Sequence, residues 1–332
     1  MTGTGAETAA AVRTDGRRST EKLKTGIFRG YDTERKRIMR EYQIENEVLK
    51  ASVREMGAEL SSLVKKESGT EYLWSGDARY WSGISPILFP VVGNFRDKQY
   101  RYEGKTYTMQ QHGFARRRNF RLVSRTEEEI WLALEDDEET YAQYPFRFCL
   151  EAGYRLEGNF LRVMWRVRSR EGKTMYFSIG GHPAIRCPLT GTPDKTVGYL
   201  GFENEDEFLY YLLVDPATNR VGDKYHSFHL DGGVHRITKD LFDYDALMFD
   251  NYQVKTAWLA GADKVPYIRL HTQAPVTAFW SPEKTDAPFV CFEPWYGIPD
   301  GVDFSGTLEE RRWGQKAEAG QTFEAEYSLE IL

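Results

Sequence analysis

Short runs in which apolar and polar residues alternate one for one dominate this sequence from about Tyr42 to its end. Successive side chains in a β-strand point to opposite sides, so this period of two indicates strands with one buried and one exposed face. Long helical periodicity is hard to find in the same region. The clearest run is Phe160–Arg168, where Leu161, Val163, Trp165 and Val167 alternate with Arg162, Met164, Arg166 and Arg168.

Glu-Gly pairs separate several of these runs and predict tight turns between neighbouring strands. They occur at Glu103 and Gly104, at Glu157 and Gly158, and at Glu171 and Gly172. Each pair predicts a hairpin. Further strands are expected at Glu47–Arg54, Leu60–Lys65, Ile130–Leu134, Phe146–Tyr154, Ala257–Leu259, Tyr267–His271, Thr277–Trp280, Phe289–Glu293 and Phe323–Ile331.

The order of these elements predicts an all-β fold, a large antiparallel β-sandwich with few short helices. Strands do not alternate with helices, which argues against a Rossmann or TIM-barrel architecture. No break in composition follows Tyr42, so residues 42–332 are expected to form a single domain. A core of the required size is available, because 41% of the 332 residues are hydrophobic.

Residues 1–41 differ from the rest and are expected to form a disordered basic extension. Gly, Ala, Thr and Ser dominate this stretch, and it holds ten Lys or Arg against six Asp or Glu. Such a composition offers little apolar surface to bury.

Net charge and cysteine usage exclude several classes of partner. The net charge of −6 is unsuited to binding a phosphate backbone, so no nucleic acid is expected. Cys149, Cys187 and Cys291 are few and widely spaced, which favours a reducing cytoplasm over a secreted disulfide framework. No apolar run approaches the ~20 residues that cross a bilayer, and no apolar segment follows the early charges, so no membrane contact is expected.

Three segments concentrate ionisable and chain-bending residues within otherwise strand-like sequence. They are residues 110–116, which contain His112, residues 180–184, which contain His182, and residues 291–297, which contain Glu293. Proton-carrying side chains at strand ends beside Gly or Pro are a common way to build a site. Glu293 follows an apolar run, so partial desolvation should raise its pKa and make it a usable base. A structural role for each of the three residues is the alternative reading.

No metal and no cofactor is expected. His226 and His229 are the only closely spaced histidines, and on a strand they would point to opposite faces. A serine nucleophile elbow, a P-loop and a dinucleotide-binding glycine motif are all absent.

Taken together, the motifs resemble the aldose 1-epimerase (galactose mutarotase-like) family. The resemblance runs from about Tyr42 to Leu332 through residues 87–94 (ILFPVVGN), 112–116 (HGFAR), 181–183 (GHP) and 293–297 (EPWYG). It implies a galactose mutarotase-like β-sandwich and an isomerase that interconverts sugar anomers. By the same resemblance Glu293 is the general base, His182 the general acid and His112 a second histidine near the ring oxygen. The expected sugar ligands are Arg96, Arg116, Asp245 and Trp295. For Trp295, as for Tyr296 and Phe114, a role in the core is an equal alternative.

The expected substrate is a free aldohexose, handled by a monomer or homodimer. Two alternatives remain open: a mutarotase for hexose 6-phosphates, and a carbohydrate-binding protein without turnover. The related phosphate-specific branch tends to carry an Arg-Gly-Gly element where this chain has Trp81-Ser82-Gly83. Which sugar is used does not follow from the sequence.

Overall fold

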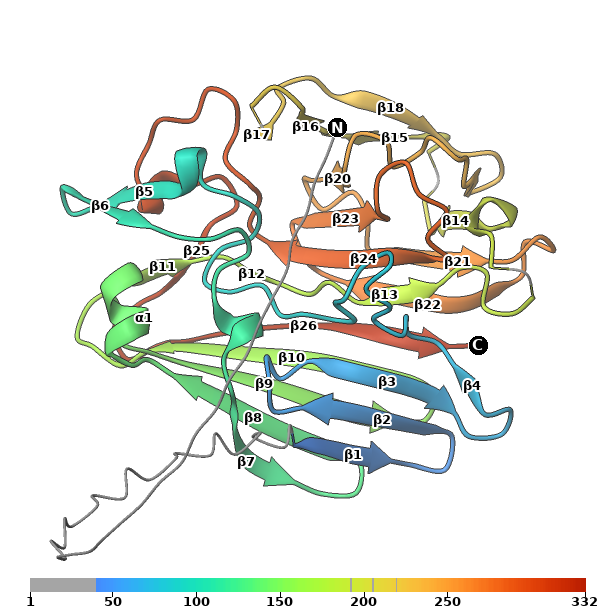
Figure 1. Cartoon of the computed structure of the whole chain (residues 1–332), viewed down its shortest axis with the longest axis horizontal. Coiled ribbons are helices and arrows are strands. Elements are labelled where there is room, and N and C mark those ends of the chain that lie inside the picture. The colour runs from blue at the N-terminus through green and yellow to red at the C-terminus, as the bar shows by residue number, and fades with distance from the viewer. Residues whose placement is uncertain (1–39, 192, 205, 219) are drawn as a thin grey trace, which may run out of the picture. The chain divides into compact units, whose positions relative to one another are not determined.

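Nine strands pair side by side into the largest sheet of the described residues, and every neighbouring pair is antiparallel. A computed structural model describes residues 40–191, 193–204, 206–218 and 220–332. In sheet order the strands are β19 (Val234–Arg236), β14 (Tyr199–Phe202), β21 (Thr256–Ala260), β22 (Pro266–Thr272), β26 (Thr322–Ile331), β10 (Phe160–Ser169), β9 (Phe148–Glu157), β8 (Glu129–Glu135) and β7 (Arg121–Arg125). Figure 1 shows β26 and β10 crossing the middle of this sheet.

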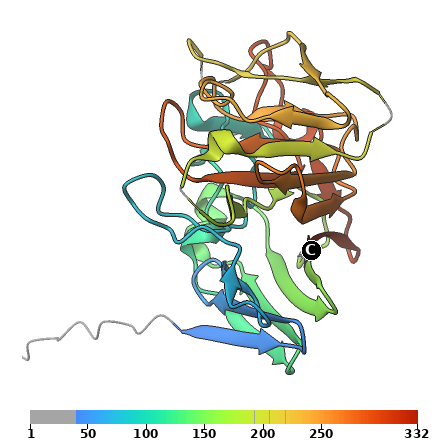
Figure 2. The same cartoon turned by 90° about the vertical axis from the view of Figure 1, so that its right-hand side faces the viewer.

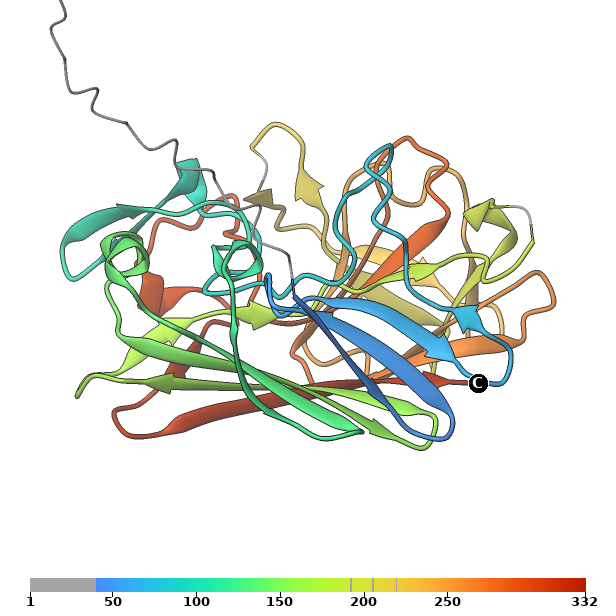
Figure 3. The same ribbon diagram turned by 60° about the horizontal axis from the view of Figure 1, so that its bottom comes forward.

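Two further sheets supply the rest of the sandwich. One has the order β1 (Glu41–Glu45), β2 (Leu49–Arg54), β3 (Leu60–Lys65) and β4 (Thr70–Glu71). In the other, β12 (Ile179–Gly180) and β13 (Ala184–Arg186) pair with β24 (Phe289–Tyr296), followed by β23 (Val276–Trp280) and β20 (Leu247–Phe249). Figures 2 and 3 show β1–β3 lying over the strands β7–β10 of the large sheet.

The main hydrophobic core lies between the nine-stranded sheet and the other two. Leu161 and Leu150 enter it from the large sheet, Ala51 from β2 and Phe292 from β24, and all four are fully buried. The alternation in β10 has the predicted consequence, because Arg166 and Arg168 on its other face are exposed. The all-β antiparallel fold class is therefore confirmed.

The remaining elements are short. They are the pairs β5 (Gln99–Tyr102) with β6 (Lys105–Thr108), β11 (Met175–Phe177) with β25 (Gln315–Ala317), β15 (Phe208–Tyr211) with β18 (His226–His229) and β16 (Val214–Asp215) with β17 (Arg220–Val221). The described helices are α1 (Glu138–Gln143) and the 3-10 turns η1 (Arg96–Lys98), η2 (Ala115–Arg117), η3 (Lys195–Val197) and η4 (Leu308–Glu310). None of the described helices has the length and apolarity needed to cross a membrane.

Two of the three predicted hairpins are confirmed and one is wrong. The turns at Glu103 and at Glu157 join β5 to β6 and β9 to β10. The turn at Glu171 does not return the chain to β10, because β9 and β26 already occupy both edges of that strand. Met175–Phe177 pairs instead with β25. Of the predicted extension, residues 1–41, only Arg40 and Glu41 fall among the described residues.

Replacing a core side chain on β24 tests the packing between the sheets. Phe292→Ala should lower the free energy of unfolding by about 3–5 kcal/mol, because it removes a buried ring and leaves a cavity. Val123→Ala is a suitable control, since Val123 on β7 is 44% exposed, and it should change stability by less than about 0.5 kcal/mol. Urea unfolding measures both, and equal effects of the two substitutions would contradict this assignment of the core.

Candidate active site

The strand β24 has two apolar faces, and the carboxyl of Glu293 lies on the one that is turned away from the main core. Val290 and Phe292 belong to the main core. Cys291 and Trp295 pack into two smaller clusters on the opposite side. Glu293 lies between these two along the strand and therefore shares their face. Only 1% of its surface is exposed.

His182 lies beside Glu293 because the segments before and after it both pair with β24. Gly180 in β12 lies opposite Trp295, and Ala184 in β13 lies opposite Cys291. The bend between the two short strands therefore falls opposite Glu293. The His182 Nε2 and Glu293 Oε2 atoms are 3.1 Å apart, and His182 is 7% exposed.

Two glycines allow this bend to approach its neighbours closely. A Cβ atom on Gly180 would lie 2.5 Å from the Trp295 ring, and one on Gly181 would lie 2.9 Å from the Tyr327 ring. Both distances are shorter than real Cβ contacts, so any larger residue would push the bend away from β24 or from β26. The Gly-Gly-His sequence is thus explained by packing as well as by chemistry.

Two tryptophans hold the imidazole of His182. The Trp81 ring stacks on it with centroids 4.8 Å apart, and the Trp280 ring meets it edge-on at 5.5 Å. Within the described residues, neither His182 Nδ1 nor Glu293 Oε1 has a hydrogen-bond partner, although both atoms are buried. Buried polar atoms are nearly always hydrogen-bonded, so these two atoms are available to a polar partner.

His112 completes the group from a loop between β6 and η2. Its backbone has φ of +62°, and its N–H donates to the Gly93 carbonyl at 2.8 Å. The Gly93 N–H in turn donates to His112 Nδ1 at 3.1 Å, which leaves the proton of the neutral ring on Nε2. The His112 and His182 rings are perpendicular, with centroids 5.9 Å apart.

Burial decides the protonation of these residues. It raises the pKa of Glu293 well above its ordinary value, and the charge of Asp245 raises it further. It lowers the pKa of His182 to about 3 and that of His112 well below its ordinary value. Both shifts favour neutral side chains, so the one titratable proton of the Glu293–His182 pair rests on the carboxyl in the free protein.

Arg116 and Asp245 lie close enough to act on this pair electrostatically. The Arg116 charge contributes to the lowered pKa of both histidines, and its own pKa is lowered by burial. Arg116 Nη2 donates to the Gln111 carbonyl at 3.1 Å. Asp245 precedes β20, and burial raises its pKa although a hydrogen bond from the Ala246 N–H, at 2.8 Å, opposes the shift. Both side chains are half-buried.

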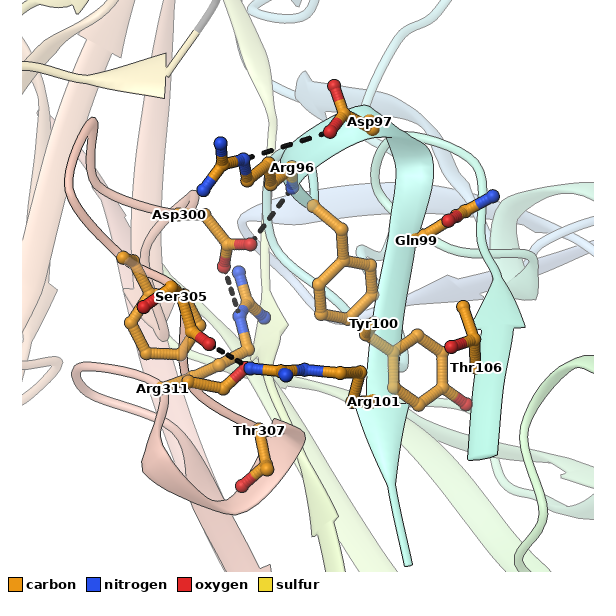
Figure 4. A pocket seen from close by; sticks show the side chains of 13 residues that line it. Arg96, Asp97, Gln99, Tyr100, Arg101, Thr106, Asp300, Ser305, Thr307 and Arg311 are labelled. Carbon is orange, nitrogen blue, oxygen red and sulfur yellow. Dashed lines mark hydrogen bonds and ion pairs between the residues drawn. The ribbon is translucent and has the colours of Figure 1, made fainter. Parts of the chain in front are cut away.

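Arg96 and Trp295 are placed differently from this group. Arg96 lies at a pocket of about 290 Å³ whose lining contains none of Glu293, His182 and His112. Figure 4 shows its side chain beside Asp97, at 3.7 Å, while its backbone N–H donates to Asp300. Trp295 shares the face of Glu293 but is 3% exposed and packs in an apolar cluster. Sugar-binding roles for Arg96 and Trp295 stay predictions.

The other aromatic candidates near these motifs are core residues. Phe114 packs in the main core against Phe89 and Phe148. Tyr296 packs against the same core, on the face of β24 opposite Glu293. Sequence reasoning did not single out Trp81, Trp280 or Cys291 as neighbours of His182 and Glu293. Cys291 begins the segment 291–297 that contains Glu293, but no local motif marks the two tryptophans.

The aldose 1-epimerase family model matches residues 40–330, nearly the whole described chain. The chain belongs to the aldose 1-epimerase family. Among curated proteins it is similar to the chromosomal protein LacX of Lactococcus lactis, at 28% identity, with 87% of this chain and 99% of LacX covered.

Solved structures place this aldose 1-epimerase family member among galactose mutarotase-like folds. A galactose mutarotase related enzyme from Lactobacillus acidophilus is 30% identical, with a TM-score of 0.82 over 88% of this chain and 97% of that one. A galactose mutarotase-like protein from Lactobacillus casei is 29% identical, with a TM-score of 0.80 over 88% and 100%.

The hydrogen bond from Gly93 predicts the tautomer of His112. Nitrogen-15 NMR should show the neutral ring with its proton on Nε2 from pH 8 to below pH 6.5, because its pKa is lowered by burial. In urea the same residue should protonate near the ordinary histidine value of about 6.5. A folded-state signal from the Nδ1–H tautomer, or protonation at the same pH in both states, would contradict the geometry.

Proposed function

We propose that this protein interconverts the α and β anomers of a free aldohexose by opening and reclosing the pyranose ring. The observation that carries the proposal is the buried Glu293–His182 pair, with 3.1 Å between Oε2 and Nε2 and a buried atom without a partner on each side chain. The reaction needs one group that accepts a proton and one that donates a proton. A pair that holds a single proton supplies both.

The proton movements balance over a complete cycle. The reactive form of the pair is reached when the proton of Glu293 moves to His182 across the 3.1 Å contact. The Glu293 carboxylate then takes the proton of the C1 hydroxyl while His182 gives its proton to the ring oxygen. The bond between C1 and the ring oxygen breaks, and the C1 carbonyl forms. Glu293 is then protonated and His182 neutral. After C1 has turned, the two transfers run in reverse, and the pair returns to its starting state without a cofactor.

The surrounding groups favour this cycle. Burial disfavours isolated charges, so neither Glu293 nor His182 is locked in an ionised form. His112 offers an Nε2–H donor, and its ring centroid lies 5.9 Å from that of His182. This donor is suited to a sugar oxygen that binds beside His182. Arg116 Nε is buried without a partner among the described residues and is a second donor. Asp245 is the acceptor that this proposal assigns to a sugar hydroxyl.

A free sugar, rather than its 6-phosphate, is supported by the position of Trp81. The segment at which the phosphate-specific branch carries arginine supplies here an aromatic ring that stacks on His182. A tryptophan face suits a sugar ring and cannot neutralise a phosphate, which proteins hold with charge-assisted bonds.

Substituting the two proton carriers tests the proposed chemistry. Glu293→Gln and His182→Asn should each lower the rate of anomer exchange by roughly 10²-fold or more, because neither amide can carry the required proton. The double variant should be little slower than the slower single variant, since the two groups act in one event. NMR exchange measurements over a sugar panel give the rates, and calorimetry gives the affinities.

Matched controls for this experiment are Glu157→Gln and His229→Asn, because both side chains are exposed. Both controls should retain the wild-type rate. Wild-type exchange no faster than buffer with every sugar would overturn the proposal and leave a carbohydrate-binding protein as the explanation.

Substrate preference forms a separate prediction. Glucose and galactose should be turned over with a higher specificity constant than glucose 6-phosphate, and added salt should not change KM for the free sugars. Polarimetry with freshly dissolved single anomers measures this. A tenfold advantage for the 6-phosphate would identify the phosphate-specific alternative as correct.

A further inference from the structure

Cys291 lies next to the two proton carriers but has no part in the proposed proton transfers. Cys291 and Glu293 are two residues apart on one face of β24, and His182 faces them from the β12–β13 bend. One ligand atom from each of the three side chains lies within 4.8 Å of the other two. All three residues are buried.

These three donors form the kind of ligand set that zinc binds. Imidazole nitrogen, thiolate sulfur and carboxylate oxygen hold Zn²⁺ at about 2.0–2.3 Å, which places neighbouring ligand atoms about 3.5 Å apart. His182 Nε2 and Glu293 Oε2 are already 3.1 Å apart. The three ligand atoms lie within 4.8 Å of one another, so side-chain rotations that move the sulfur by about 1.5 Å would bring it into the same coordination sphere.

Charge balance also favours a divalent ion at this position. A thiolate and a carboxylate together neutralise Zn²⁺, so the complex with a neutral imidazole carries no net charge and can be buried at low cost. Arg116 is the nearby cation that opposes metal binding, and the carboxyl of Asp245 offsets it. Glu293 Oε1, buried without a partner in the described part of the chain, leaves the carboxylate a second oxygen for the ion.

We propose that His182, Cys291 and Glu293 bind Zn²⁺ or a chemically similar ion, and that the bound metal inhibits the protein. On binding, the thiol proton and the proton shared by His182 and Glu293 pass to solvent. The metal then occupies both proton carriers, so the sugar finds neither an acid nor a base. Inhibition rests on the proposed function, whereas metal binding does not.

Cobalt titration tests the site without using activity. Co²⁺ added to the full chain should bind at one equivalent and give the ultraviolet charge-transfer absorption of a cobalt–thiolate bond. Cys291→Ser should abolish that absorption, and His182→Asn should weaken Co²⁺ binding by at least about tenfold, because each removes a ligand. Cys149→Ser is the control, since Cys149 is also buried but lies on β9, and it should behave as wild type.

Thermal unfolding of each variant shows whether it is folded. If Cys291→Ser does not fold, the Co²⁺ affinity of His182→Asn still tests the metal site. Cobalt binding without thiolate absorption, absorption that survives Cys291→Ser, or loss of absorption in Cys149→Ser would overturn the proposed site. In the activity arm, Zn²⁺ should slow anomer exchange in wild type and Cys149→Ser, each compared with its own rate without metal, but not in Cys291→Ser. If the wild-type protein does not speed anomer exchange, the proposed function is refuted, and the cobalt titration still tests the metal site.

Discussion

The burial of the Glu293 carboxyl is the constraint on which the arrangement around it depends. A carboxylate removed from water costs several kcal/mol unless it is paired or protonated. Here the group that pairs with the carboxyl is the His182 imidazole, 3.1 Å away, rather than an arginine or lysine. A permanent cation would lock Glu293 in its ionised form, whereas an imidazole leaves the proton free to move between the two.

Backbone pairing keeps this pair together. β12 and β13 both hydrogen-bond to β24, so His182 is fixed to the same strand that carries its partner. The strand itself cannot shift easily, because Val290 and Phe292 on its other face belong to the main core. Core packing therefore positions Glu293 and His182, and stability and the proposed chemistry depend on the same strand.

The loop residues are held by a different device. His112 comes from a connection rather than from a strand, and loops alone position side chains poorly. Two hydrogen bonds with Gly93 fix both the position and the tautomer of His112. The His112 backbone N–H donates to the Gly93 carbonyl, and the Gly93 N–H donates to the His112 ring. Gly93 itself is confined, since a Cβ on it would lie 2.1 Å from Pro299, which follows β24. The His112 loop is thereby tied to the segment that carries Glu293.

The alternation of side chains along strands such as Phe160–Arg168 was enough to determine the fold class, because a period of two admits only half-buried strands. The motifs around His112, His182 and Glu293 identified the three residues that the fold brings together. The sequence did not reveal which strands pair with β10, because strand pairing depends on segments that are distant in the chain. The hairpin expected at Glu171 was wrong for that reason, since β9 and β26 flank β10.

Tertiary structure alone decided which other residues lie beside Glu293 and His182. Trp280 on β23 and Trp81 in the segment after β4 are far from His182 in the sequence, so no local pattern could mark them, whereas Cys291 stands two residues before Glu293 and only its closeness to His182 depends on the fold. Arg96 lies at a pocket whose lining contains none of Glu293, His182 and His112, where its backbone N–H donates to Asp300, and its sugar-binding role stays a prediction. Sequence records the chemistry of each side chain, but the distance between two side chains is set by the packing of the sheets that carry them.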